Sequence, residues 1–547
     1  MTHPRRSLAA RAYREVAFRL TGEDPRQFLD LADLPRLNKL LASAGLPPLT
    51  APPMPDVVLG ERALRVYELS RELRDGLPLA LTPAGRQGFL NWAVHHSSGE
   101  HRVSAAEALA LLAYTDRLPD RGLELSYRLH PAWQEAVPDA LVGGWSNLTR
   151  FVRERCGVRG RWLDATTPSP PTPLPQGERG VNLVAHFEYA SGLQQAAYGL
   201  VDALHAAGVR TSLRDLPVTF RPDPLAPRRL GVEEFDTTVH LAAVNTFPDD
   251  WYPTAGLWPR PGVRRIAVWY WEMEDVPAEW VPRLGWADEV WAPTRFIADT
   301  FRKYVSVPVV PMLPGVVLPS FEPKPRSAFG LRDGRFAFLF TFDLFSTLAR
   351  KNPLGLIAAF RKAFRRDEPV DLVLKVSRGD EMPADFAVLK AACDDNGVTL
   401  LNAVLPRGDL LALMAACDSY VSLHRSEGLG LGMAEAMLLG KPVIGTGYSG
   451  NLDFMTDDNS HLVRCDRVPC TADAPPYRKG FIWGEPDLDH AAELMRRVYE
   501  NRAEAAAKGE RAKRELAEVL SLEAYAKRVG ERLSLPPSFP GKGGRGG

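Results

Sequence analysis

Two glutamates, Glu427 and Glu435, stand eight positions apart in a glycine-rich stretch and are the most informative residues of the sequence. Carboxylates accept hydrogen bonds from hydroxyl groups, so this pair suits a ligand that is rich in hydroxyls. Gly428, Gly430 and Gly432 allow backbone N–H groups to approach a ligand closely and to converge on negative oxygens. The combination predicts a site for a ligand with both hydroxyl and phosphate groups, as in a nucleotide sugar.

The segments around this stretch predict where the two acids lie. The apolar run at residues 420–423 predicts a buried strand, and Gly440 and Pro442 end the short helix that follows the glycines. Glu427 then lies on a loop at the carboxyl end of a strand, where ligands bind in open α/β sheets. Glu435 lies on the helix, away from its apolar face. The alternative is a strand-to-helix turn with two solvated glutamates, and the spacing of both acids counts against it.

A pair of cations precedes a second predicted helix. Asn352 and Pro353 suit the N-cap and the first position of a helix that runs to Phe364. Arg350 and Lys351 therefore come directly before a helix N-terminus, where the helix dipole adds partial positive charge. Two cations and a helix dipole predict a diphosphate site. A basic surface turn is the alternative interpretation.

These segments resemble the E-x7-E signature of the retaining glycosyltransferases of family 4, whose fold is called GT-B. The resemblance extends to three further segments of the family: its first strand and loop, its phosphate-binding segment and the loop after the signature, here at residues 182–192, 341–353 and 449–459. It covers about residues 181–535. It implies transfer of a sugar from a nucleoside-diphosphate sugar to an acceptor hydroxyl with retention, without a metal ion or another cofactor. One position departs from the family, because many members carry an arginine six positions before the lysine, where Phe345 stands here.

The resemblance also implies the roles of individual residues. Lys351 and Glu427 are the expected catalytic residues. Glu435 is expected to hold the ribose hydroxyls. The donor-binding residues are expected to be Gly192, Arg350, Lys351, Glu427, Gly428, Leu429, Gly430, Leu431 and Glu435.

The first half of this region is the half expected to bind the acceptor. His240 lies on a predicted strand and Glu272 follows another, so both are candidates for acceptor contact. A core position is the alternative for the histidine, since a lone strand histidine is more often structural. The acceptor is expected to be a glycan or a lipid-linked hydroxyl.

The order of elements predicts an α/β protein with two doubly wound Rossmann-like domains, preceded by a mainly helical N-terminal region. The helical region takes residues 1–164, and a proline-rich linker follows at 165–180. Strands and helices alternate over 181–322 in the acceptor-side domain. They alternate again over 323–535 in the donor-binding domain, whose last helix is expected to cross back to the first domain. The tail, 536–547, is expected to be disordered.

Composition excludes several classes of protein. The 67 basic residues balance the 67 acidic ones, so net charge gives no reason to expect nucleic acid as a partner. The five cysteines are scattered without a zinc or disulfide pattern, which indicates a reducing, cytoplasmic setting. No apolar run has the length of a membrane span. Five arginines in the first twenty residues suit either a solvated helix face or peripheral contact with the inner membrane face.

Two other functions stay open from the sequence. One is a catalytically silent nucleotide-sugar-binding or scaffold protein, against which the joint presence of Lys351, Glu427 and Glu435 counts. The other is a phosphorylase or epimerase with the same fold. Residues Asp457 and Asp458 lie in a polar loop, and no Asp-x-Asp pair follows an apolar strand in the second half, so no metal-ligand pair is evident.

Overall fold

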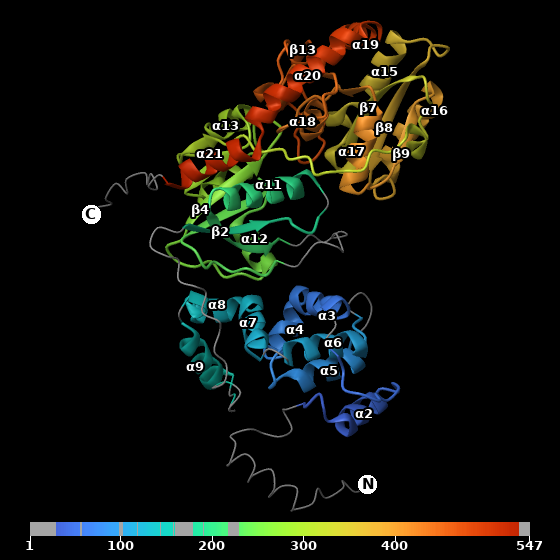
Figure 1. Ribbon diagram of the computed structural model, residues 1–547. Helices are drawn as coiled ribbons and strands as arrows, with labels where there is room; N and C mark the ends of the chain where they lie inside the picture. Colours follow the sequence, from blue (N-terminus) through green and yellow to red (C-terminus); the bar gives the residue numbers. More distant parts are fainter. Residues whose placement is uncertain are drawn as a thin grey trace, which may run out of the picture.

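The computed structural model describes residues 29–534 except 55–56, 98–101, 117–118, 143, 157, 159–162, 164–178, 190 and 217–228 (Figure 1). Three predicted features therefore lie outside the described residues. They are the arginine-rich first twenty residues, the proline-rich linker apart from its last two residues, and the tail after residue 535.

The N-terminal part is helical, as the sequence predicts. Ser104 and Glu107 begin one of its helices with reciprocal bonds, the Ser104 backbone N–H to the Glu107 carboxylate and the Glu107 N–H to the serine oxygen. The helices are α2 (Leu34–Ser43), α3 (Val57–Leu69), α4 (Arg71–Gly76), α5 (Arg86–His95), α6 (Ala105–Asp116), α7 (Pro119–Leu129), α8 (Pro131–Ala136) and α9 (Trp145–Arg155).

The first α/β domain is built on a six-stranded parallel sheet in the order β2-β1-β3-β4-β5-β6. Its inner strands contain apolar runs, as expected where helices cover both faces of a sheet, whereas the edge strand β2 is mostly polar. The strands are β1 (Arg179–Ala185), β2 (Val209–Asp215), β3 (Thr237–Ala243), β4 (Arg264–Tyr270), β5 (Glu289–Ala292) and β6 (Val309–Pro311). The helices are α11 (Gly192–Ala206), α12 (Pro248–Ala255) and α13 (Arg295–Phe301).

The second α/β domain repeats the plan with a six-stranded parallel sheet in the order β12-β11-β10-β7-β8-β9. Two edge strands of this sheet, β9 and β12, are short and were not among the predicted strands. The strands are β7 (Phe336–Asp343), β8 (Val370–Ser377), β9 (Thr399–Asn402), β10 (Ser419–Ser422), β11 (Val443–Thr446) and β12 (His461–Val463). The helices are α14 (Leu348–Lys351), α15 (Pro353–Ala363), α16 (Pro383–Asn396), α17 (Arg407–Ala416), α18 (Leu431–Leu438), α19 (Leu488–Glu500) and α20 (Arg502–Val519). Two doubly wound domains after a helical region confirm the predicted fold class.

The last helix, α21 (Leu522–Ser534), returns to the first domain, as predicted (Figure 1). Tyr525 and Val529 join the apolar cluster that includes Leu200 of α11. Arg532 forms an ion pair with Glu289, with Nε 2.6 Å from Oε1. This helix ties the end of the chain to the outer side of the first domain.

The N-terminal helices α2 to α7 form an apolar cluster of their own, and a second cluster joins the end of the helical region to the first domain. Trp133 and Trp145 share one buried cluster with Trp251 of α12. Arg214 of β2 is buried and donates to the Ala255 carbonyl at 2.6 Å and to the Arg128 carbonyl at 2.8 Å. The helical region is therefore continuous with the domain that was expected to bind the acceptor.

An antiparallel hairpin, which the sequence did not predict, lies between β12 and α19 and consists of β13 (Cys465–Pro469) and β14 (Ile482–Pro486). It belongs to the second domain in sequence, but Cys470, Tyr477 and Trp483 join an apolar cluster of the first domain. The hairpin thus connects the two domains beside the opening between them.

Candidate active site

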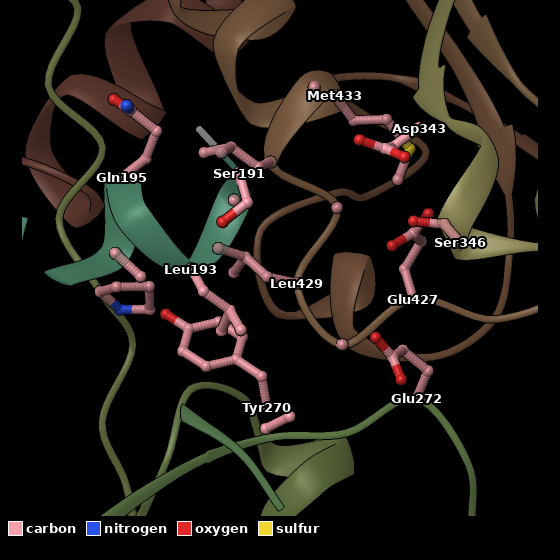
Figure 2. Close-up of a pocket in the computed structure, with 18 of the residues that line it drawn as sticks. Ser191, Leu193, Gln195, Tyr270, Glu272, Asp343, Ser346, Glu427, Leu429 and Met433 are labelled. Carbon is pink, nitrogen blue, oxygen red and sulfur yellow. The ribbon is translucent and has the colours of Figure 1, made fainter. Parts of the chain in front are cut away.

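A cavity of about 650 Å³ lies between the carboxyl ends of the two sheets (Figure 2). Parallel strands end at the same edge of a sheet, so the loops of both domains meet there. The first domain contributes the loop before α11 and the ends of β3 and β4. The second domain contributes α14, the first residue of α17, the glycine-rich loop, the start of α18 and part of the hairpin loop.

Glu427 lies at the centre of an ion network in this cavity. The Lys351 ammonium pairs with one carboxylate oxygen, and Arg350 Nη1 lies 3.2 Å from the other. Burial raises the pKa of Glu427, but Lys351 and Arg350 outweigh this effect and lower the pKa to about 2. The Glu427 carboxylate is therefore ionised at neutral pH and is suited to stabilise positive charge.

Arg350 connects this network to the first domain. Its Nη1 donates to the Ser426 carbonyl at 2.9 Å, and its Nη2 lies 3.9 Å from the Glu272 carboxylate. Its guanidinium lies over the Tyr477 ring, 5.6 Å from the centroid. Arg350 is only 3% exposed, so it acts mainly on the carboxylates around it, whereas more of Lys351 reaches the cavity.

The predicted helix start after these cations is confirmed. Asn352 is the N-cap of α15, and its side-chain oxygen accepts from the Gly355 N–H at 3.2 Å. Its amide nitrogen donates to the Leu423 carbonyl at 3.0 Å, which links the cap to the end of β10. The two bonds hold the loop with Lys351 against the loop with Glu427.

The glycine-rich loop needs glycine for close packing between chain segments. Gly430 has φ +89°, a conformation that favours glycine. A Cβ on Gly432 would stand 2.4 Å from the Tyr420 hydroxyl, and one on Gly428 would stand 3.0 Å from the Trp271 carbonyl of the first domain. Gly428, Leu429, Gly430 and Leu431 all line the cavity, and the two glycines do so with their backbone, since they have no side chain.

Glu435 lies behind the cavity wall. It is 2% exposed, and its Oε1 lies 2.6 Å from Nη2 of Arg407, which lines the cavity at the start of α17. Burial raises the pKa of Glu435, and Arg407 partly offsets this effect. Arg407 was not among the predicted site residues, because an arginine at the start of a helix carries no local signal of its partner in the folded protein.

Two predicted residues of the first domain reach the cavity. Gly192 lies at the N-terminus of α11, after Ser191, whose oxygen accepts from the Gln194 N–H at 3.3 Å. Glu272 follows β4, and Figure 2 shows its carboxylate at the same end of the cavity as that of Glu427. The Tyr477 hydroxyl donates to Glu272 Oε2 at 3.1 Å.

His240 does not line the cavity. It is fully buried in the first domain, 4.6 Å from the Trp251 ring and 5.6 Å from the Trp286 ring, measured between centroids. Neither ring nitrogen has a hydrogen-bond partner in the part of the chain that the structure describes. Burial lowers the pKa of His240 to about 3. The expected acceptor contact of this side chain is therefore corrected to a packing position.

Two properties of the described residues concern ions and membranes. Within residues 29–534, apart from the gaps given above, no group of three or more histidine, cysteine or acidic side chains is placed to hold a metal ion. No described helix combines the length and apolar character needed to span a bilayer.

Residues 337–474 match the family model described as glycosyl transferases group 1. The matched segment includes Lys351, Glu427, Glu435 and most of the second sheet. No curated protein matches the chain in sequence.

Solved structures with a similar arrangement share little sequence with this chain. HepE from Anabaena, in complex with UDP and glucose, has a TM-score of 0.46 and 14% identity over 65% of this chain and 100% of its own. Sucrose-phosphate synthase from Thermosynechococcus elongatus has a TM-score of 0.47 and 16% identity over 65% of this chain and 98% of its own. WaaG, a glycosyltransferase involved in lipopolysaccharide biosynthesis, has a TM-score of 0.41 and 14% identity over 65% of this chain and 100% of its own.

Proposed function

We propose that this protein is a glycosyltransferase that moves a sugar from a nucleoside-diphosphate sugar to an acceptor hydroxyl, with retention and without a metal ion. The observation that carries the proposal is the network of Lys351, Arg350 and Glu427 beside the glycine-rich loop, within the segment that matches the group 1 family. The cavity between two α/β domains supplies room for donor and acceptor together.

The difficult step is the departure of the diphosphate from the anomeric carbon. Negative charge grows on the leaving oxygen, and a fixed cation or backbone N–H at that point lowers the barrier. Lys351 lines the cavity and is held there by Glu427, while the amides of the glycine-rich loop lie on the same wall. We assign stabilisation of the leaving group to Lys351 and to these amides.

Glu427 supports the positive charge that develops on the sugar. Its pKa of about 2 means that it carries no proton to donate at neutral pH. An ionised carboxylate near the anomeric carbon stabilises an oxocarbenium-like transition state electrostatically. It also accepts hydrogen bonds from hydroxyls of the transferred sugar.

The nucleoside is assigned to the wall formed by Arg407, with Glu435 behind it. Their ion pair joins a donor and an acceptor of hydrogen bonds in one unit. Ribose hydroxyls can both donate and accept, so they suit this pair. The acceptor is assigned to the first-domain wall, where Glu272 offers a carboxylate to an incoming hydroxyl of a glycan or of a lipid-linked sugar.

A donor screen tests the proposal. Purified protein is mixed with UDP-, GDP-, ADP- and dTDP-glucose and with GDP-mannose, and the thermal midpoint and the release of nucleoside diphosphate are measured. We expect one donor class to raise the midpoint and to be turned over, because a ligand that binds only the folded state stabilises it. Binding without turnover, with or without acceptors, would support the silent alternative. Release that requires inorganic phosphate would support a phosphorylase.

A further inference from the structure

Side chains of the β13–β14 hairpin and its loop contact carboxylates of the first domain. Arg467 pairs with Glu274, and Arg478 pairs with Glu279. Both arginines are about half exposed or more, so these pairs contribute little to stability. The third contact is different in kind, because Tyr477 is 5% exposed and lies at the cavity wall.

Tyr477 is held on three sides. Its ring lies 5.6 Å from the Trp271 ring and lies against the Arg350 guanidinium, also at 5.6 Å. Its hydroxyl donates to Glu272 Oε2 at 3.1 Å. The side chain therefore cannot move without disturbing either the first-domain wall or the ion network of the second domain.

The hydroxyl of Tyr477 decides where the Glu272 carboxylate points. One oxygen of Glu272 accepts from Tyr477, and the other lies 3.9 Å from Arg350, too far for a direct hydrogen bond. A carboxylate without the tyrosine bond would be drawn to the guanidinium, since charge-assisted bonds are the stronger ones. In the present arrangement the Glu272 side chain keeps 24% of its surface exposed.

We propose that Tyr477 is a positioning residue for the acceptor. Its hydroxyl holds the Glu272 carboxylate away from Arg350 and accessible to a hydroxyl of a sugar acceptor. The hairpin brings Tyr477 across the domain boundary to this carboxylate. The inference rests on the proposed function and names the side of the cavity and the residue that orient the acceptor.

The chain contains a matched control at Tyr448. The Tyr448 hydroxyl donates to Glu274 at 2.7 Å, so it also joins the second domain to a carboxylate of the first. Tyr448 is 8% exposed and does not line the cavity. Replacing each tyrosine with phenylalanine removes one partly buried interdomain hydrogen bond, and only one of the two tyrosines lines the cavity.

The experiment compares Tyr477→Phe and Tyr448→Phe with the wild type. The donor is the one turned over fastest in the screen, and the acceptor probes are p-nitrophenyl glycosides of glucose, galactose, mannose and N-acetylglucosamine. Transfer to each glycoside and hydrolysis of the donor without acceptor are measured. Circular dichroism and thermal midpoints confirm folding.

We expect Tyr477→Phe to raise the acceptor KM about tenfold, the lower end of the range for one lost hydrogen bond to a charged group. The donor KM should rise much less than the acceptor KM, and Tyr448→Phe should change neither. Glu272→Gln should raise the acceptor KM as well, and adding Tyr477→Phe to it should have little further effect, because both changes act on one carboxylate.

Three results would overturn the inference. Equal effects of the two tyrosine variants would show that the bonds act only in joining the domains. Additive effects of Tyr477→Phe and Glu272→Gln would show that the hydroxyl does not act through the carboxylate. If the wild-type protein hydrolyses the donor but uses none of the glycosides as acceptor, the assignment of Glu272 to a hydroxyl of a sugar acceptor would be wrong. Failure of the proposed function is separate, since the wild type would then release no nucleoside diphosphate from any donor, and the inference would fail with it.

Discussion

The two walls of the cavity differ in how their charges are held. In the second domain, Lys351 and Arg350 neutralise Glu427 with contacts made inside that domain. In the first domain, the Glu272 carboxylate finds its partners, Tyr477 and Arg350, across the domain boundary. The second-domain wall is therefore preorganised by its own fold, whereas the first-domain wall depends on the contact between domains.

Two buried histidines, one in each domain, differ in the kind of neighbour that surrounds them. His424 of the second domain has hydrogen-bond partners at 3.1 Å, the Ser422 hydroxyl and the Asn451 side-chain oxygen. His240 of the first domain is enclosed by tryptophan rings and has no such partner in the described chain. His424 is therefore held by polar contacts, whereas His240 is held by aromatic packing.

The largest expected effect tests the charged wall. Lys351→Ala should reduce turnover about 10²- to 10³-fold, because it removes a fixed cation from the leaving oxygen. Lys351→Arg should restore only part of the rate, since a planar guanidinium does not replace a compact ammonium. The measurement is single-turnover transfer at saturating donor, with circular dichroism as a control for folding. A folded alanine variant with the wild-type rate would remove Lys351 from the mechanism.

Glycines at the start of a helix in each domain give the next comparison. Gly432→Ala should destabilise the second domain by about 3 kcal/mol, at the upper end for overpacking, because its Cβ would stand 2.4 Å from the Tyr420 hydroxyl. Gly192→Ala should change stability by less than about 0.5 kcal/mol, since nothing lies within 4 Å of that Cβ. Urea unfolding followed by fluorescence measures both. Equal losses would contradict the difference in packing.

Glu435→Gln tests the wall behind Arg407. Glu435 acts through Arg407, whose proposed contacts go to ribose. The charge of ribose does not change during the reaction, so the variant should weaken donor binding more than it slows chemistry. We expect a loss of about 2 kcal/mol in donor binding, as for a charged hydrogen bond. Adding Arg407→Ala should cost less than the sum of the two single changes, since the two side chains form one ion pair. A normal donor KM with a strongly reduced kcat would reverse the assignment.

His240 predicts a pH effect on stability. Its pKa is about 3 in the folded protein against an ordinary 6.5, so the stability that it contributes is complete above pH 6.5 and is lost as pH falls towards 3. Between pH 6.5 and 5.5 the wild type should lose about 1 kcal/mol more unfolding free energy than His240→Phe, which keeps an aromatic ring and cannot titrate. Urea unfolding at the two pH values measures this difference. Parallel pH dependences would show that His240 does not stay neutral.

Chelation is expected to have the smallest effect. If Lys351 and backbone amides carry the diphosphate, transfer in excess EDTA should proceed at the untreated rate. The assay uses the donor from the screen, with manganese and magnesium added back in parallel samples. If EDTA abolishes activity and either ion restores it, a metal ion and not Lys351 with the backbone amides would bind the diphosphate.

Local sequence determined most of the fold and the second-domain wall. Most inner strands of the parallel sheets contain apolar runs, and some helix starts, such as Asn352–Pro353, carry their own capping residues, so many elements could be predicted from a short window. The edge strands β9 and β12 escaped prediction, because each pairs on one side only and neither is a fully buried apolar run like β10 or β11. Glu427 with the glycine-rich loop, and Lys351 before α15, were predicted as site residues for a similar reason, since each lies in a strand-loop-helix unit with a local sequence pattern.

Only the tertiary structure decided the pairing of these residues and the first-domain wall. Tyr477 is 205 positions from Glu272, and nothing near either residue indicates the other. Arg407 contacts Glu435 only because α17 and α18 pack together. His240 does not contact a ligand in the cavity, because two tryptophans enclose it. Sequence windows report the propensity of a segment, whereas a partner across the fold is set by how the elements pack. The hairpin whose loop lines part of the cavity therefore became visible only in three dimensions.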